Sequence, residues 1–257
     1  MTILEVQGLT KAFGGVEALS DIDLQVTTGD VVGVIGPNGA GKSTLFNVLS
    51  GVMRPTRGKV RFQDKDITGL KPHRIAARGL VRTFQGTELF SDLSVMDNVR
   101  VACALPARVN LLADVVGLPS VARKETEMRR RAADIVELTG LQDVRHKLAR
   151  DLPHGHQRAL GVGIALATGP QLLCLDEPVT GMNMEETEAM IALIDRIHRQ
   201  NVTILLVEHH MKVVMTVCQR IVVLNFGKKI AEGGVDEIQG NQDVIEAYLG
   251  RPEDDVA

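Results

Sequence analysis

Apolar positions in the N-terminal part of the chain follow two different spacings. Residues 4–13 and 18–26 alternate apolar with polar side chains, residues 58–67 do so more loosely, and turn-forming residues bound each stretch. This alternation predicts antiparallel strands. Residues 31–35 are instead continuously apolar, and residues 45–50 that follow have helical character. The pattern therefore predicts a buried strand that leads into a helix, flanked by antiparallel strands.

The middle of the chain changes to a helical pattern. Residues 78–85 predict a short strand that ends in Gln85, and most of the segment that follows has helical spacing. The clearest helix is residues 123–138, with Gly140 as its predicted stop. Residues 102–120 are apolar but contain prolines and a glycine. We expect irregular structure there, which either forms a satellite core or docks another subunit.

Three short apolar runs follow in the C-terminal part, at residues 171–175, 202–207 and 221–224. Runs this short and this apolar are typical of parallel strands covered on both faces. Between the first two lies a predicted helix with Asn183 as its N-cap and Glu186 three residues later, a variant of the capping box. The pattern as a whole predicts an α/β chain with a parallel sheet.

A glycine-rich segment joins the first apolar run to its helix and has the pattern G-x-x-x-x-G-K-[ST], the P-loop. Its residues are Gly36, Pro37, Asn38, Gly39, Ala40, Gly41, Lys42, Ser43 and Thr44. Glycines let successive backbone N–H groups point into one concavity, and the helix N-terminus adds partial positive charge. We therefore predict that the segment binds a polyphosphate. Lys42 would reach the β- and γ-phosphates, and the Ser43 hydroxyl would help to hold Mg²⁺.

Polar residues follow the apolar runs at the places where parallel sheets bind ligands, the C-terminal ends of the strands. Asp176 follows residues 171–175 and is predicted to hold Mg²⁺ opposite Ser43. Glu177 is a candidate to orient or deprotonate the attacking water; the alternatives are a helix-start acid or an ion-pair partner. His209 follows the next run, and we predict that it contacts the γ-phosphate or the attacking water rather than serving a structural role.

Phe13 precedes Gly14 and Gly15 on a predicted turn. Its ring is either a core or hairpin aromatic, or an exposed ring that stacks on a purine. The sequence leaves both uses open.

Composition limits the class of protein. The chain has 257 residues, of which 44% are hydrophobic and 24% charged, which is typical of a globular protein. Aromatic residues make up only 3%, so the core must be aliphatic. The net charge of −3 argues against a nucleic-acid partner held by a generally basic surface.

Cysteine usage and hydropathy indicate the cellular compartment in which the chain works. Cys103, Cys174 and Cys218 lack metal-ligand spacing and are predicted to be reduced thiols of a cytosolic protein. Residues 1–8 do not have the pattern of a signal peptide. The most apolar stretch, residues 159–175, is interrupted by glycines and a proline and is too short to span a bilayer. We therefore expect any membrane role to come through a partner.

These motifs together resemble the nucleotide-binding subunit of an ABC transporter, and the resemblance covers essentially the whole chain. The stretches that carry it are the P-loop, Gln85, residues 172–178 and His209. Further stretches resemble the ATPase subunits of branched-chain amino-acid importers and their relatives. They are residues 82–85, residues 181–183, residues 207–209 with Met211, and the tail at residues 244–250.

The resemblance implies a fold and its division. It implies a P-loop NTPase (RecA-like) core with a parallel sheet, an antiparallel β subdomain and an inserted α-helical subdomain. The chain would be a single ABC ATPase domain, residues 1–257. Residues 1–85 and 152–257 would form the nucleotide-binding core with the β subdomain, and residues 86–151 the helical subdomain.

The resemblance also implies roles for individual residues. It assigns Phe13 to adenine stacking and Gln85 to sensing both Mg²⁺ and the membrane subunit. It assigns Glu177 to hydrolysis and His209 to the γ-phosphate. Residues 181–184 match the loop that crosses the dimer interface in this family.

One stretch departs from the family pattern. The signature Leu-Ser-Gly-Gly-Gln, or Leu-Ser-Tyr-Gly-Gln in this branch, caps the ATP held by the opposite P-loop of a dimer. Here the segment reads Leu152, Pro153, His154, Gly155, His156 and then Gln157. Pro153 replaces the serine and supplies neither a hydroxyl nor an N–H, whereas Gly155 still permits close backbone approach. His154 and His156 either add bulk or supply replacement donors. We therefore favour a heterodimer over a homodimer, with a partner's signature completing this chain's P-loop.

The resemblance implies an ATPase that binds ATP and Mg²⁺ at the cytoplasmic face of the inner membrane as a peripheral subunit. The expected partners are two membrane-spanning permease subunits, a second ATP-binding subunit and, in an importer, a solute-binding protein, without nucleic acid. We expect import of amino acids or a related small polar solute. The alternatives are the ATPase of an envelope lipid exporter and a soluble non-transport ABC protein.

Overall fold

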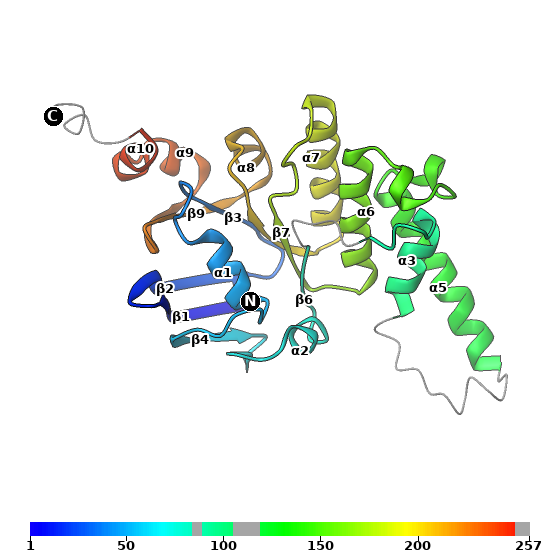
Figure 1. The fold of residues 1–257 in the computed structure, drawn as a ribbon, viewed down its shortest axis with the longest axis horizontal. Coiled ribbons are helices and arrows are strands. Elements are labelled where there is room, and N and C mark those ends of the chain that lie inside the picture. Colours follow the sequence, from blue (N-terminus) through cyan, green and yellow to red (C-terminus); the bar gives the residue numbers. More distant parts are fainter. Residues whose placement is uncertain (84–88, 105–118, 250–257) are drawn as a thin grey trace.

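The computed structural model describes residues 1–83, 89–104 and 119–249, and these form two sheets surrounded by helices (Figure 1). The strands are β1 (Thr2–Phe13), β2 (Val16–Thr27), β3 (Val31–Ile35), β4 (Arg57–Phe62), β5 (Lys65–Asp66), β6 (Leu80–Arg82), β7 (Leu172–Asp176), β8 (Thr203–Val207), β9 (Arg220–Asn225) and β10 (Lys228–Gly233). The α-helices are α1 (Lys42–Leu49), α2 (Pro72–Ala76), α3 (Val95–Ala104), α5 (Pro119–Leu138), α6 (His154–Ala167), α7 (Met184–His198), α8 (Met211–Val217), α9 (Val235–Gln239) and α10 (Gln242–Leu249). Two 3₁₀ turns, η1 (Gln142–Val144) and η2 (Ala149–Asp151), lie between α5 and α6.

The larger sheet has the strand order β10-β9-β3-β8-β7-β6 and is parallel except for β10. Val207, the last residue of β8, lies opposite Val34 on one side and Asp176 on the other. The central strands therefore end at the same level, and the loops that leave them meet at one edge. The predicted parallel sheet is confirmed.

The smaller sheet is antiparallel, with the order β2-β1-β4-β5, and packs with α1 on one face of the parallel sheet (Figure 1). Val32 and Val34 of β3 join this core, whereas Val31 and Ile35 face a second core formed with α6, α7 and α8. Successive side chains of β3 thus enter opposite cores. This explains why the strand is apolar at every position.

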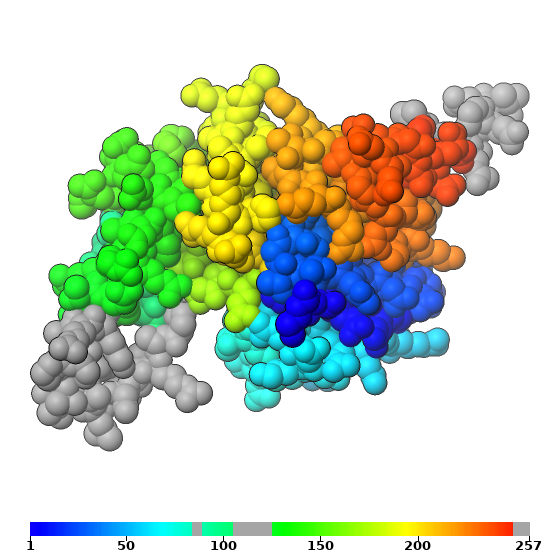
Figure 2. Space-filling view, turned by 180° about the vertical axis from the view of Figure 1, so that it is seen from behind, coloured from blue at the N-terminus to red at the C-terminus, as the bar shows by residue number. Residues whose placement is uncertain are grey.

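The segments α3 and α5 pack against α6 and extend the second core away from the small sheet. Figure 2 shows the green segment that includes α5 at one end of the molecule and the red C-terminal helices at the other. The predicted α/β fold with an antiparallel sheet and additional helices is therefore confirmed. The predicted stop at Gly140 is also confirmed, because this residue has a φ of 74°.

One predicted strand is divided in the structure. Residues 58–67 were expected to form one strand, but a turn at Gln63 and Asp64 divides them into β4 and β5. These two residues have φ angles of 49° and 58°, which a strand does not accommodate. The spacing of apolar residues is compatible with either arrangement, so it did not reveal the turn.

Helix and strand limits also differ. The predicted helix 123–138 begins at Pro119, four residues earlier. Part of the region expected to be irregular, residues 102–104 and 119–120, is helical, while residues 105–118 lie outside the described residues. Among the described residues of the strand predicted for 78–85, Leu80–Arg82 form β6. Gln85 lies outside the described residues.

The three cysteines are free and buried, in agreement with the predicted thiols. Burial raises the pKa of the Cys174 and Cys218 thiols to about 12, so both stay protonated and unreactive near neutral pH. Among the described residues, none of the helices combines the length and the hydropathy needed to cross a bilayer.

Asn98 of α3 yields a prediction for stability. Its side chain is fully buried, and its amide donates to the carbonyls of Phe90 and Ser94 and accepts from the Phe90 N–H, at 3.0, 2.9 and 2.9 Å. Asn98→Ala should lower the free energy of unfolding by about 2–3 kcal/mol, because the hydrogen bonds of this buried amide are lost and a cavity replaces it. Urea denaturation measures the change. The exposed Arg100→Ala on the same helix is the control, and equal midpoints for the two variants would contradict the assignment.

Candidate nucleotide-binding site

The loop between β3 and α1 requires glycine at two positions, because neighbouring backbone leaves no room for a Cβ atom there. Gly36, Gly39 and Gly41 have φ angles of 150°, 80° and 106°. A Cβ at Gly36 would lie 2.1 Å from the carbonyl oxygen of Leu224, and one at Gly41 would lie 2.6 Å from that of Ala18. Both distances are shorter than any real Cβ contact, so the loop packs this tightly only because these side chains are missing.

The helix that follows the loop presents an uncapped N-terminus. Gly41 is the N-cap of α1 and no side chain caps it, so the first N–H groups remain available to an anion. Lys42 is only 7% exposed, and its ammonium donates to the carbonyls of Gly36 and Pro37 at 2.7 and 2.9 Å. Burial lowers the pKa of Lys42, and the nearby charge of Glu177 acts in the opposite direction. Positive charge is thus gathered inside the loop, as polyphosphate binding requires.

Asp176 ends β7 at the same edge of the sheet and is 3% exposed. Its Oδ2 accepts a hydrogen bond from Arg82 at 2.7 Å, while its Oδ1 has no hydrogen-bond partner within the described part of the chain. A buried carboxylate oxygen without a partner suits a hard cation, because Mg²⁺ binds oxygen ligands. The predicted Mg²⁺ ligand therefore fits that group, and the exposed Ser43 in the first turn of α1 supplies a second oxygen donor.

Arg82 received no role of its own from the sequence patterns, although this residue lies within the predicted strand 78–85 and ends the observed strand β6. Its guanidinium also donates to Asn47 Oδ1 at 2.7 Å and to Ser50 Oγ at 3.1 Å, both on or next to α1. Its carbon Cζ lies 5.6 Å from the centre of the Phe46 ring. Arg82 therefore ties the end of β7 to the helix that follows the P-loop and neutralises the carboxylate of Asp176.

Glu177 and His209 come together from adjacent strand ends. Glu177 has a φ of 46°, its N–H donates to the Val207 carbonyl at 2.9 Å, and its Oε2 accepts from the Thr180 hydroxyl at 3.3 Å. His209 Nδ1 lies 3.8 Å from Glu177 Oε1, and the two side chains are 45% and 20% exposed. A non-glycine residue in the left-handed region marks a strained position of the kind found at functional sites. The acid and the histidine thus lie side by side at the solvent-accessible edge of the site.

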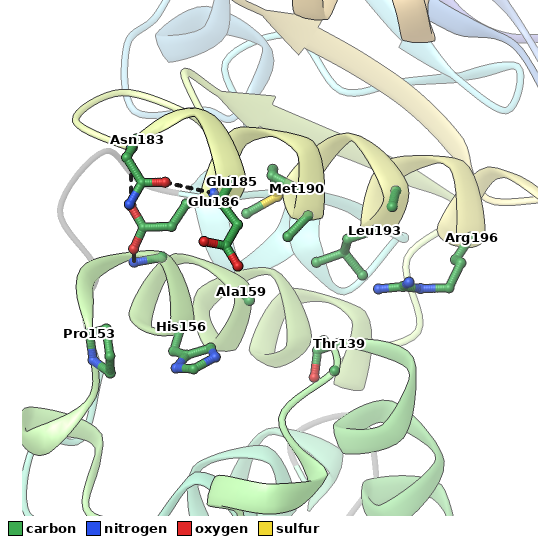
Figure 3. A pocket seen from close by; sticks show the side chains of 14 residues that line it. Thr139, Pro153, His156, Ala159, Asn183, Glu185, Glu186, Met190, Leu193 and Arg196 are labelled. Carbon is green, nitrogen blue, oxygen red and sulfur yellow. Dashed lines mark hydrogen bonds between the residues drawn. The ribbon is translucent and has the colours of Figure 1, made fainter.

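The signature segment makes its contacts with α7 (Figure 3). Pro153 is the N-cap of α6, and the Gly155 N–H donates to Glu186 Oε1 at 3.0 Å. Glu186 Oε2 accepts from the Asn183 N–H at 3.1 Å, and Asn183 Oδ1 accepts from the Glu186 N–H at 2.9 Å, so the predicted capping box is confirmed. These hydrogen bonds, together with the charges of the neighbouring His154 and His156, hold the pKa of Glu186 below its ordinary value.

Glu186 changes the reading of Gly155. A Cβ at Gly155 would lie 2.7 Å from Glu186 Oε1, so a larger residue there would displace this carboxylate and weaken a contact within the chain. The sequence suggested only that it permits close approach of a nucleotide. The contact lies at one end of a pocket of about 420 Å³ between α6 and α7, whose other end is lined by Thr139 and Arg196 (Figure 3).

Phe13 and Gln85 complete the predicted set. Phe13 ends β1 and is 46% exposed, with the Lys11 ammonium 4.9 Å from the centre of its ring. The ring is therefore not in the core. Phe13 pairs with Val16 at the hairpin between β1 and β2, so a hairpin aromatic remains open and stacking on a purine stays a prediction. Gln85 lies outside the described residues, and its predicted role as a Mg²⁺ sensor stays a prediction too.

The ion pair of Arg82 with Asp176 generates a second prediction. Arg82→Met keeps an apolar chain but leaves the buried carboxylate without its counter-charge. The free energy of unfolding should fall by about 3–5 kcal/mol without Mg²⁺, measured by urea denaturation. The matched control is Arg82→Met combined with Asp176→Asn, which removes both charges and should recover part of the loss. An Arg82→Met protein as stable as this double variant would contradict the interpretation.

Two family models match the chain. The model described as ABC transporter matches residues 19–180, and the model described as branched-chain amino acid ATP-binding cassette transporter matches residues 228–254. The first match spans the P-loop, Asp176 and Glu177, and the second spans most of the C-terminal helices.

Similar proteins agree with these matches. The branched-chain amino acid transport ATP-binding protein BraF of Pseudomonas aeruginosa is 43% identical over 96% of this chain and 98% of its own length. LivG of Escherichia coli, described in the same words, is 40% identical over the same shares. Among solved structures, the ADP conformation of an ATP-binding cassette of an ABC transporter aligns with a TM-score of 0.84 and 31% identity, over 98% of this chain and 100% of that one. The chain is a member of the ABC transporter family, and its fold is that of the ATP-binding cassette.

Proposed function

We propose that this chain is an ATPase subunit of a branched-chain amino acid importer and drives transport through separate membrane subunits. The observation that carries the proposal is the 43% identity with BraF over nearly the whole of both chains. The match of residues 228–254 to the branched-chain amino acid transporter model supports the same branch of the family. The substrate of hydrolysis is ATP, and the cargo is an amino acid with an apolar side chain.

ATP binds with its phosphates in the loop of residues 36–44. Backbone N–H groups at the start of α1 and the Lys42 ammonium hold the phosphates, because both present positive charge to the loop. Ser43, Asp176 and Gln85 would hold Mg²⁺, which would supply positive charge beside the phosphate oxygens. The exposed ring of Phe13 stacks on the adenine.

Hydrolysis depends on Glu177 and His209. Glu177 orients the attacking water and accepts its proton, since it is a partly exposed carboxylate beside the Mg²⁺ ligand Asp176. His209 donates a hydrogen bond to the γ-phosphate or to that water. Their 3.8 Å separation leaves both within reach of one water molecule.

The division of the chain and its partners complete the proposal. Residues 1–85 and 152–257 form the nucleotide-binding core with the β subdomain, and residues 86–151 form the helical subdomain. Gln85 and the helical subdomain dock two membrane-spanning permease subunits at the cytoplasmic face of the inner membrane, where the chain is a peripheral subunit. A solute-binding protein delivers the amino acid to the permease.

The altered signature supports a heterodimer with a second ATP-binding subunit. Pro153 offers no hydroxyl to the nucleotide on the opposite P-loop, whereas this chain's own P-loop, Asp176 and Glu177 are intact. The partner's signature then completes an active ATP site at this chain's P-loop. Pro153 faces the ATP on the partner's P-loop, where hydrolysis is slow.

Glu177→Gln tests the ATPase and the transport role together. The amide keeps the shape of the side chain but accepts a proton poorly, so kcat should fall by about 10²- to 10⁴-fold with little change in the KM for ATP. In the native host, deletion of the gene should abolish uptake of labelled leucine, isoleucine and valine, and the unaltered chain should restore it. Glu177→Gln should fail to restore uptake, whereas the exposed Glu185→Gln on α7 should succeed. Unchanged branched-chain uptake in the deletion strain would overturn the choice of cargo.

Pro153→Ser tests the heterodimer. A lost hydrogen bond to a charged group amounts to about 1.5–3 kcal/mol, so the purified chain alone should hydrolyse ATP slowly and Pro153→Ser should raise the rate by about ten- to a hundredfold. Pro153→Ala, which also lacks a hydroxyl, is the matched control and should not raise it. Full ATPase activity of the unaltered chain as a homodimer would refute the hypothesis.

A further inference from the structure

Glu208 is a buried acid for which the sequence offered no role. It follows β8, is 0% exposed, and its carboxylate accepts the backbone N–H groups of Val179, His209 and His210 at 3.2, 2.8 and 3.0 Å. The oxygen Oε2 of Glu208, which accepts from the His209 and His210 N–H groups, also lies 3.1 Å from Nδ1 of the His210 ring. Burial of a carboxylate is unfavourable unless it is hydrogen-bonded in this way, so its contacts reveal what it holds in place.

The carboxylate joins two loops that leave neighbouring strands. Val179 lies two residues after Glu177 in the loop that follows β7, and His209 and His210 lie in the loop that follows β8. Glu208 therefore fixes the separation of the two loops that carry Glu177 and His209. The hydrogen bond from the Glu177 N–H to the Val207 carbonyl joins the same loops at their bases.

His210 extends this network to the His209 imidazole. The two rings are 4.4 Å apart between their centres and inclined by 36°, and each side chain is nearly half exposed. His209 Nδ1 lies 3.7 Å from Glu208 Oε2 and 3.8 Å from Glu177 Oε1, both beyond hydrogen-bond distance. Backbone contacts and the His210 ring, rather than a direct hydrogen bond to either acid, thus set where the imidazole lies.

The same three side chains bring ligand atoms within 4.8 Å of one another, a spacing that a metal ion could also use. The Glu208 carboxylate already accepts hydrogen bonds from three backbone N–H groups, however, and is enclosed by protein. Its lone pairs are committed to the loops. The arrangement therefore suits a support for His209 better than a metal site.

We propose that Glu208 and His210 are positioning residues for ATP hydrolysis. Glu208 holds the loop after β8 against the loop after β7, and it orients the His210 ring, which packs on the His209 imidazole and keeps it beside Glu177. The inference rests on the role of His209 in the proposed function. It adds two residues that act through His209 without touching the nucleotide.

The test measures kcat and the KM for ATP of each variant in the purified complex with the second ATP-binding subunit, with His209→Ala as the reference. Glu208→Ala should lower kcat by about 10- to 100-fold, because a displacement of about 1 Å at a reacting group has effects of this size. The KM should change by less than about threefold, since the lost contacts do not bind ATP. Thr203→Val is the matched control: Thr203 is buried on β8 at the end remote from the site, where its Oγ1 accepts the Gly29 N–H at 3.0 Å. This control should leave kcat within about twofold.

Variants of His210 show whether a loss of kcat comes from the missing ring or from a less stable fold. His210 is exposed, so its replacement leaves the core filled and the fold intact. His210→Ala removes the stacked ring and should lower kcat by about three- to tenfold. His210→Phe keeps a ring against His209 but loses the contact with Glu208, so it should retain more activity than His210→Ala.

A double-mutant cycle supplies the decisive result. If both residues act through His209, their substitutions should lower kcat by a smaller factor in the His209→Ala background than in the unaltered chain. The remaining effect should be less than about twofold for His210, whereas Glu208 also holds the loop of Glu177 and should retain part of its effect. Equal losses in the two backgrounds would overturn the proposal. A normal kcat in His209→Ala would overturn both this proposal and the role of His209. A low kcat in His209→Ala with normal rates in the Glu208 and His210 variants would overturn the positioning role alone.

Discussion

The parallel register of the central strands determines where every charged group of the site lies. Because Val207 pairs with Val34 on one side and with Asp176 on the other, the ends of β3, β8 and β7 lie level with one another. The P-loop, Asp176, Glu177 and His209 all begin at such an end or within two residues of it. A strand that shifted by one residue would also turn its side chains to the opposite core, so the apolar faces of the strands protect the geometry of the site.

Charge compensation is the second constraint at this edge. Asp176 is neutralised by Arg82, Glu208 by backbone N–H groups, and Lys42 by loop carbonyls with Glu177 nearby. Each buried charge has a partner on a different element, so the same interactions that make burial tolerable also tie these elements together. Among these three charged groups, only the carboxylate of Asp176 has an oxygen, Oδ1, without a hydrogen-bond partner in the described part of the chain. A cation would bind this oxygen.

Local sequence patterns predicted much of this arrangement. They did not reveal the contacts between residues that are far apart in the sequence. The P-loop, the buried strands and the Asn183 capping box depend on residues a few positions apart, so their spacing was visible in the sequence. Arg82 and Asp176 are 94 residues apart, and Gly155 and Glu186 are 31 apart. No periodicity connects such residues; only the packing of β6 beside β7 and of α6 beside α7 does. The turn at Gln63 was missed for a different reason, since alternation does not show where a strand folds back on itself.

The contact of Glu186 with Gly155 bears on whether the altered signature, residues 152–157, can bind the nucleotide of a partner. In a helix that begins at a proline, no side-chain hydroxyl caps the first turn, and the carboxylate of Glu186 takes up the Gly155 N–H instead. A phosphate that approached the same N–H would have to displace this carboxylate, and it would also find no serine hydroxyl. Two independent features, one from the sequence and one from the fold, therefore both disfavour a nucleotide at this end of α6.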